Sequence, residues 1–302
     1  MRLEAALGER TMDGRATKWT RRDVLRMGTG AAALLACSPS FGKRRKKKKR
    51  QKGEQEGIPV ALQLYSVRND CAKDFPGVLE AVAEMGYLGV EFAGYYGKSA
   101  AELKKLLDDN GLRAPSTHTQ MAGLEGDQFD RTVEFHKAIG AEFIIVPGMP
   151  PKYHQTRQGW LDAAKAFNDL AERLKEHGLR TGYHNHSFEF KPLEGELPWD
   201  TFFSNTSKEV VHQIDTGNCM SGGGDPVHFI RKYADRTALV HLKEHGGPGN
   251  FGEGECPWDE VFDACETVGG TAWYIVEQEN YNQPPLDCVK QCLEFLKSKG
   301  KA

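Results

Sequence analysis

Residues 129–147 read FDRTVEFHKAIGAEFIIVP, and this stretch contains the unit from which we expect the fold to be built. Apolar residues recur at helical spacing over residues 129–139, and Gly140 follows at a position where a left-handed residue often ends a helix. The apolar run 143–147 then has the length and composition of a buried strand. The stretch therefore predicts a helix, a capping glycine and a strand in immediate succession.

The same order recurs on both sides of this stretch. Gly86, Gly111 and Gly178 mark further helix ends, and a strand-like run follows each glycine within a few residues. The composition predicts strands at 60–65, 88–92, 113–117, 143–147, 180–184, 210–215, 239–241 and 273–277. The intervening periodicity predicts helices at 77–85, 100–110, 129–139, 157–177, 199–205, 226–233, 258–268 and 285–299.

Eight strand–helix units over residues 58–302 match the usual length of a (β/α)8 barrel, so we predict an α/β protein with the TIM-barrel fold. A doubly wound open sheet is the alternative. Such sheets usually carry a glycine-rich phosphate loop after the first strand, and residues 63–68, QLYSVR, contain no glycine. In a parallel barrel the active site lies at the C-terminal ends of the strands, which directs attention to the residues that close each strand.

The charge of the chain divides at about residue 56. The 302 residues include 40 Lys and Arg and 42 Asp and Glu, for a net charge of −2. Residues 1–56 contain 16 Lys and Arg but 6 Asp and Glu, which leaves 24 and 36 for the remainder. The acidic remainder argues against nucleic acid as the main partner, because phosphate binding needs a basic face. No apolar run reaches the roughly 18 residues of a transmembrane segment.

The basic N-terminal part is interpreted as a targeting segment and a linker rather than as a folded domain. Arg21-Arg22, a short apolar segment and small residues resemble a twin-arginine export signal over residues 1–37, which predicts an exported, periplasmic protein. Lipid attachment at Cys37 is an alternative end for this segment. Residues 38–57 include eight consecutive cations at 43–50 and are predicted to be a solvated basic linker.

Four consecutive predicted strands end in residues that bind metals: His184, Asp215, His241 and Glu277. Imidazole nitrogens and carboxylate oxygens suit a divalent ion such as Mn²⁺, Zn²⁺, Co²⁺ or Fe²⁺. Converging carboxylates would repel one another without a cation between them. Each residue alone has an ordinary structural explanation, but the ordered set predicts one divalent metal ion. His186 or Glu189 is the alternative ligand if His184 is not one.

Several motifs together resemble the sugar phosphate isomerase/epimerase family, whose members have a xylose isomerase-like barrel. They are 184–190 (HNHSFEF), 215–218 (DTGN), 241–243 (HLK) and 276–277 (VE), and the resemblance extends over nearly all of residues 58–300. It implies one metal held by Glu, Asp, His and Glu. Asp215, His241 and Glu277 match the last three, whereas His184 stands in place of the first glutamate.

That departure bears on the reaction. In the ketose epimerases of this family the two ligand glutamates also transfer the proton, so the resemblance puts a symmetric epimerisation in doubt here. We expect a metal-dependent sugar isomerase or epimerase that acts through an enediolate. A keto-sugar or inosose lyase or dehydratase is the alternative, which the strand around His184 resembles. A non-catalytic carbohydrate-binding barrel is the alternative from another class.

The remaining polar residues at strand ends receive expected roles. Glu277, His186, Lys243 and Glu91 are the candidates for proton transfer or oxyanion support, and Glu277 would also bind the metal. The candidates for substrate binding are Gln63, His118, Asn218 and Trp258, with apolar walls from Tyr65, Phe92 and Tyr281.

The remaining expectations concern the binding partners and the histidines outside the predicted site. The absence of a phosphate loop and of a basic cluster favours a neutral sugar or keto-sugar as the small-molecule partner, and the resemblance implies a homodimer. His136, His177 and His228 are expected to be solvated on outer helices. His212 is excluded from the site because it begins its strand and so lies at the opposite end of the barrel.

Overall fold

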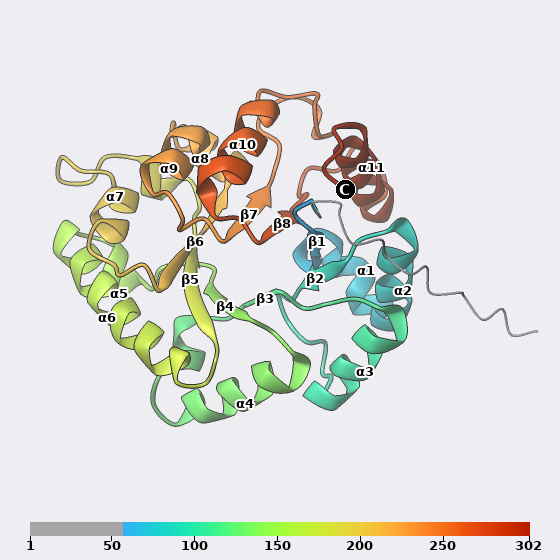
Figure 1. The fold of residues 1–302 in the computed structure, drawn as a ribbon, viewed down its shortest axis with the longest axis horizontal. Helices are drawn as coiled ribbons and strands as arrows, with labels where there is room; N and C mark the ends of the chain where they lie inside the picture. Colours follow the sequence, from blue (N-terminus) through green and yellow to red (C-terminus); the bar gives the residue numbers. More distant parts are fainter. Residues whose placement is uncertain (1–56) are drawn as a thin grey trace, which may run out of the picture. The chain divides into compact units, whose positions relative to one another are not determined.

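The computed structural model describes residues 57–302, in which helices surround a central ring of parallel strands (Figure 1). The strands are β1 (Val60–Gln63), β2 (Gly89–Glu91), β3 (Ser116–His118), β4 (Phe143–Val146), β5 (Arg180–His184), β6 (Val210–Asp215), β7 (Leu239–Leu242) and β8 (Trp273–Val276). They pair in the order β2-β1-β8-β7-β6-β5-β4-β3. Isolated parallel bridges from Gly89 to Arg113 and from Phe92 to Thr117 join β2 to β3, so the barrel is nearly closed. The predicted TIM barrel is confirmed.

Helices follow the strands around the ring. They are α1 (Arg68–Lys73), α2 (Phe75–Met85), α3 (Ala100–Asn110), α4 (Phe129–Ile139), α5 (Pro151–His154), α6 (Arg157–Lys175), α7 (Pro198–Phe203), α8 (Thr216–Ser221), α9 (Pro226–Lys232), α10 (Trp258–Ala264) and α11 (Pro285–Ser298). Short 3₁₀ turns occur at η2 (Leu64–Val67), η3 (Met121–Leu124), η4 (Gly126–Gln128) and η5 (Phe188–Phe190). The capping glycine of the opening stretch behaves as predicted, because Gly140 ends α4 with φ 78°.

The observed elements differ from the prediction where local chemistry interrupts the pattern. The third strand begins at Ser116 rather than at 113, because Pro115 has no backbone N–H to donate to a neighbouring strand. The helix predicted over 258–268 ends at Ala264 and continues as the π-helical turn η6 (Cys265–Gly269). The short helices α1, α5 and α8 were not predicted. The predicted signal and linker lie outside the described residues, apart from Gly57, and stay predictions.

Inward-facing side chains form an apolar floor with a polar layer above it. Strand residues alternate between the barrel interior and the surrounding helices. One buried cluster consists of Ala61, Phe143, Ile145, Val211, Ala238, Leu239, Trp273 and Ile275. Two residues further along their strands, Val211 is followed by Gln213 and Ile275 by Glu277. The interior therefore changes from apolar to polar toward the C-terminal ends of the strands.

The last helix packs against the first part of the barrel. Figure 1 shows α11 beside the segment that contains α1 and α2. Lys297 Nζ donates to Met85 O at 2.9 Å, and Tyr87 Oη donates to Val289 O at 2.7 Å. These contacts join the two ends of the barrel domain. Within residues 57–302, no helix has the length and apolar character that crossing a bilayer requires.

Candidate metal and substrate site

Four buried side chains converge at the C-terminal end of the barrel. His184 closes β5, Asp215 closes β6, His241 lies in β7 and Glu277 directly follows β8. Each offers one ligand atom, and these four atoms all lie within 4.8 Å of one another. The four residues lie on or directly after four neighbouring parallel strands. Because such strands end at the same rim of the barrel, the four side chains lie close together. The sequence had predicted this set as metal ligands.

The backbone after β6 orients Asp215. Its Oδ1 accepts from the backbone N–H of Asn218 at 2.6 Å and thereby caps α8. Gly217 is needed in this helix, because a Cβ there would lie 2.6 Å from the carbonyl oxygen of Glu244. The capping bond uses one carboxylate oxygen and leaves Oδ2 buried without a hydrogen-bond partner among the described residues.

The donor set fits a divalent cation. Asp215 Oδ2 and His184 Nδ1 are both buried and make no hydrogen bond within the described part of the chain. An unsatisfied buried polar atom costs about 1–3 kcal/mol, so two in one cluster call for a ligand. Two imidazoles and two carboxylates are a donor set typical of Mn²⁺, Zn²⁺, Co²⁺ or Fe²⁺.

The pKa values of the two carboxylates in the cluster are shifted in opposite directions. Burial raises the pKa of Asp215 to about 7, against the opposing effect of Lys243, and the nearby Glu277 carboxylate adds to the rise. Burial also opposes ionisation of Glu277, but the hydrogen bond and charge of His241, together with Lys243, hold its pKa well below the usual range. His241 Nδ1 lies 2.5 Å from Glu277 Oε2. A divalent cation would favour the charged form of Asp215 as well.

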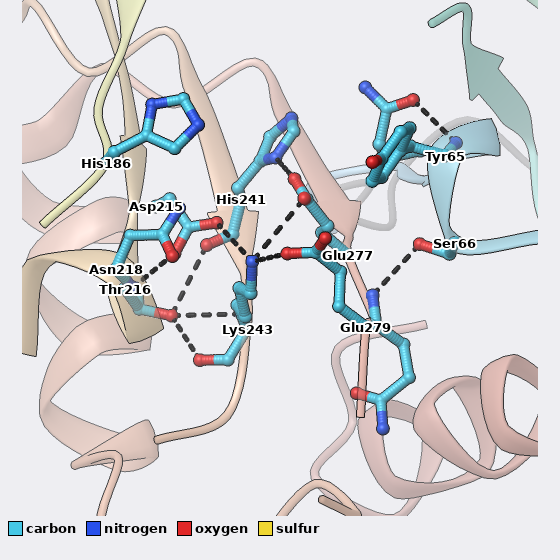
Figure 2. A network of polar contacts seen from close by, with 12 residues as sticks. Tyr65, Ser66, His186, Asp215, Thr216, Asn218, His241, Lys243, Glu277 and Glu279 are labelled. Carbon is cyan, nitrogen blue, oxygen red and sulfur yellow. Dashed lines mark hydrogen bonds and ion pairs between the residues drawn. The ribbon is translucent and has the colours of Figure 1, made fainter. Parts of the chain in front are cut away.

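Lys243 lies among three carboxylates of this site. Its Nζ is 3.5 Å from Glu277 Oε1 and 3.8 Å from Asp215 Oδ2, and it forms an ion pair with Glu279 (Figure 2). Burial favours the neutral amine, but the three carboxylates together raise the pKa of Lys243 above its ordinary value. Sequence reasoning missed Glu279. Its signal was its place two residues after Glu277 on an extended segment, which puts both side chains on one side.

A cavity of about 480 Å³ lies beside the cluster. This volume is within the range of small-molecule sites. The cavity is lined by Tyr65, Ala93, His118, Gln120, Pro147, Gly148, His184, His186, Asn218, Glu277 and Glu279. Four of the residues predicted for proton transfer or substrate binding are among them: His118, His186, Asn218 and Glu277. Tyr65 is a wall residue, and the guanidinium of Arg68 lies 4.1 Å from its ring centroid.

Four of these predicted residues do not line this cavity: Lys243, which is described above, and Gln63, Glu91 and Trp258. Gln63 and Glu91 are fully buried below it, and Gln63 Nε2 donates to Glu91 Oε2 at 2.6 Å. Trp258 is buried at the start of α10, where its ring packs on Phe251 at 4.8 Å between centroids. The placement of Trp258 as a substrate contact fails because its indole N–H is already bonded to a buried carboxylate, that of Glu244.

Two of the expected wall residues, Phe92 and Tyr281, and the alternative ligand Glu189 do not line the cavity. Phe92 is fully buried behind the strands, and Tyr281 donates its hydroxyl to Ser66 O at 2.8 Å. Glu189, the alternative ligand, accepts from Tyr183 Oη at 2.6 Å and from the backbone N–H of His186 at 3.0 Å. Burial raises the pKa of Glu189 to about 7. His184, rather than Glu189, belongs to the cluster.

The histidines outside the site differ in their surroundings. His136 is 2% exposed, so the expectation of a solvated side chain is wrong: its Nε2 lies 2.7 Å from Thr117 Oγ1 and its Nδ1 lies 2.6 Å from Thr132 O. His177 is half-buried and His228 is exposed. His212 lies away from the cluster as expected, but the predicted reason is wrong: it is the third residue of β6 rather than the first, and its side chain faces outward against Phe203 and Tyr233.

Comparison with known proteins gives consistent matches. Residues 79–299 match a family described as xylose isomerase-like TIM barrel. The rhizopine catabolism protein MocC of Rhizobium meliloti is 25% identical over 291 residues, covering 79% of this chain and 87% of that protein. An inosose dehydratase of Clostridium beijerinckii is 28% identical over 266 residues, covering 73% and 89%.

Solved structures agree with these matches. A sugar phosphate isomerase/epimerase of Parabacteroides distasonis superposes with a TM-score of 0.70 at 25% identity, covering 80% of this chain and 94% of that one. A D-allulose 3-epimerase of Methylomonas has a TM-score of 0.62 at 15% identity, covering 81% and 98%, which shows a shared fold.

Proposed function

Because the chain belongs to the xylose isomerase-like TIM barrel family, we propose that it is a metal-dependent enzyme that removes a proton next to the carbonyl of a neutral keto-sugar or keto-cyclitol. The convergence of His184, Asp215, His241 and Glu277 beside a cavity is the observation that carries this proposal. A carbohydrate-binding barrel without catalysis would not require two buried, unpartnered ligand atoms at the rim. The donor set therefore favours an enzyme.

The residues around the cavity have complementary chemistry. When bound, a divalent cation would polarise a carbonyl oxygen and offset the charge that develops as the neighbouring proton leaves. His186 lines the cavity, and its ring makes no hydrogen bond to any described residue, so it is free to accept that proton. Lys243 presents an ammonium beside Glu277 that can donate to the developing oxyanion. His118 forms part of another wall, where its ring nitrogens lie 2.7 Å from Gln213 Oε1 and 3.3 Å from Gln63 Nε2.

The cavity wall supports a neutral substrate. Its ionisable side chains are Glu277, Glu279 and three imidazoles, and Lys243 is engaged by carboxylates. A phosphate or carboxylate on the substrate would therefore meet the like charge of Glu277 and Glu279 on this wall. Hydroxyl groups, in contrast, find both donors and acceptors on this wall.

We propose elimination of water as the outcome. The C–H bond next to the carbonyl breaks and its proton passes to His186. The electron pair forms a C=C bond while the C–O bond at the next carbon breaks, and the hydroxyl leaves as water with the returned proton. Two observations support this outcome: inosose dehydratases are among the curated relatives, and the cluster contains one glutamate instead of a pair.

Isomerisation or epimerisation is the second candidate, because the Parabacteroides structure is that of a sugar phosphate isomerase/epimerase. The two outcomes share the first proton removal and differ in where the proton returns. Epimerisation needs an acid or base on each face of the substrate, for which Glu277, another residue of the cavity wall, would be the second group.

The proposal is tested with the full chain loaded with Mn²⁺ or Co²⁺ in heavy water. Inosose and neutral ketoses are supplied, and products are followed by NMR and mass spectrometry. We expect deuterium next to the carbonyl and loss of water from inosose, both abolished by Asp215→Asn. Product without loss of water would favour the second candidate. A metal-loaded chain that exchanges no proton of any neutral keto compound would overturn the proposal.

A further inference from the structure

Glu91 is the centre of a buried hydrogen-bond network that spans the barrel. Its carboxylate closes β2, is fully buried and accepts from four side chains on four other strands. Oε1 accepts from Ser116 Oγ at 2.5 Å and from Gln213 Nε2 at 2.6 Å. Oε2 accepts from Gln63 Nε2 at 2.6 Å and lies 2.6 Å from His241 Nε2. Each oxygen thus has two contacts of 2.5 or 2.6 Å, and His118 Nε2 lies 3.2 Å from Oε2, so the acceptor capacity of the carboxylate is filled.

The directions of these bonds are consistent throughout the network. A carboxylate only accepts, so Gln63 and Gln213 must both turn their amide nitrogens toward Glu91. Their amide oxygens then point elsewhere: Gln63 Oε1 accepts from the backbone N–H of Tyr65 at 3.0 Å. Gln213 Oε1 lies 2.7 Å from His118 Nε2, which must donate to it. His118 Nδ1 remains as an acceptor for the second N–H of Gln63, 3.3 Å away.

The same logic fixes the ring of His241. Its Nε2 must carry a proton to donate to Glu91, which leaves Nδ1, 2.5 Å from Glu277 Oε2, as the ring nitrogen on the side of the cluster. The ring is also held on one side by His118, which stacks on it with centroids 5.2 Å apart and planes 12° apart. Carboxylates that bind the distal nitrogen of a ligand histidine orient the ring and raise its affinity for metal.

We propose that Glu91 is a positioning residue, which fixes the tautomer and orientation of His241 so that Nδ1 binds the divalent cation. The proposal rests on the proposed function, because it assumes the metal. It replaces the expected role of Glu91 in proton transfer. Glu91 does not line the cavity, and its oxygens are occupied by donors from the protein, so it has no access to substrate.

The variant that tests this is Glu91→Gln in the full chain. The amide replaces one acceptor oxygen with a donor, so it cannot accept from all four neighbours. We expect the Kd for Co²⁺ or Mn²⁺, measured by calorimetry, to rise by about 10- to 100-fold. Glu244→Gln is the matched control, since Glu244 is also a buried carboxylate with four donors but contacts none of the four cluster residues. It should leave the metal affinity unchanged.

A measurement on the unmodified sequence keeps the proposal testable if Glu91→Gln does not fold. The full chain with ¹⁵N-labelled histidine is loaded with Zn²⁺ and examined by NMR. We expect His241 with a protonated Nε2 and with Nδ1 bound to the metal. A metal-bound Nε2, or unchanged affinity in folded Glu91→Gln, would overturn the positioning role alone. An unmodified chain that binds no divalent metal would overturn the proposed function and this inference with it.

Discussion

The indole Nε1 of Trp258 donates to Glu244 Oε2 at 2.9 Å, which joins the start of α10 to the residue that follows β7. The same carboxylate accepts from the backbone N–H groups of His245, Gly252 and Cys256 at 3.0, 2.7 and 3.0 Å. Glu244 therefore fixes the loop 245–257 at three points of its backbone. Trp258, in turn, packs on Phe251 of that loop.

Replacement of this carboxylate should loosen the loop. In Glu244→Ala the three backbone donors and the indole lose their common acceptor, and unsatisfied buried donors cost about 1–3 kcal/mol each. We expect the free energy of unfolding to fall by about 2–4 kcal/mol and limited proteolysis to cut within 245–257. Glu255→Ala is the control, because that exposed side chain lies in the same loop. Equal protease resistance in both variants would contradict the role of Glu244.

Lys243 should be needed for chemistry but not for holding the metal. Lys243→Met keeps much of the side-chain length and removes the ammonium beside Glu277. We expect deuterium incorporation into inosose to slow by about 100-fold or more, because loss of one oxyanion donor costs that much. The variant should still bind the metal, since the ammonium of Lys243 competes with the metal for the carboxylates of Asp215 and Glu277. Lys232→Met, on α9, is the control and should exchange at the normal rate.

His212 should make the protein sensitive to acid. Its ring lies among Trp199, Phe203 and Tyr233, and both ring nitrogens lack partners in the described residues. Burial, with a smaller contribution from Arg236, holds the pKa of His212 well below its ordinary value of 6.5. Below pH about 6.5 the unfolded chain therefore takes up a proton that the folded chain does not, so the free energy of unfolding falls with falling pH.

His212→Leu should reduce this sensitivity. Urea unfolding of the chelator-treated protein at pH about 7.5 and about 5 measures it, and the slope should drop by at most about 1.4 kcal/mol per pH unit. At neutral pH the variant should be as stable as the original or more stable by about 1 kcal/mol, because no hydrogen bond is lost. His228→Leu, exposed on α9, should leave the slope unchanged. A variant with an undiminished slope would assign the acid sensitivity to other groups.

The fold could be predicted from the sequence because each helix and strand has its own local pattern. The metal cluster followed from the fold, because its four residues end consecutive strands. The alternation of apolar periodicity with glycine caps, as at Ile139-Gly140, predicted the barrel. The barrel then placed Asp215 and His241 together without further information, because parallel strands bring their ends to one rim.

Which polar residues face the cavity could not be predicted in the same way. Glu91 and Glu277 both close strands, yet Glu91 is covered by side chains from other strands, which only the closed barrel brings together. Trp258 was expected to contact substrate, but its indole N–H donates to Glu244 and its side chain is buried. Glu279 was missed because its importance comes from its contact with Lys243, 36 residues away in the chain. His136 similarly contacts Thr117 on β3, 19 residues away in the chain, which its helical position alone did not indicate.

The central claim, that His184, Asp215, His241 and Glu277 bind one divalent cation, is tested most directly by counting bound metal. The full chain and Asp215→Ala are purified without chelator, dialysed against Mn²⁺ or Co²⁺, and examined by elemental analysis and calorimetry. We expect about one tightly bound ion per chain for the original and a loss of at least about 100-fold in affinity for the variant. Equal metal content in both proteins, or none in either, would contradict the claim.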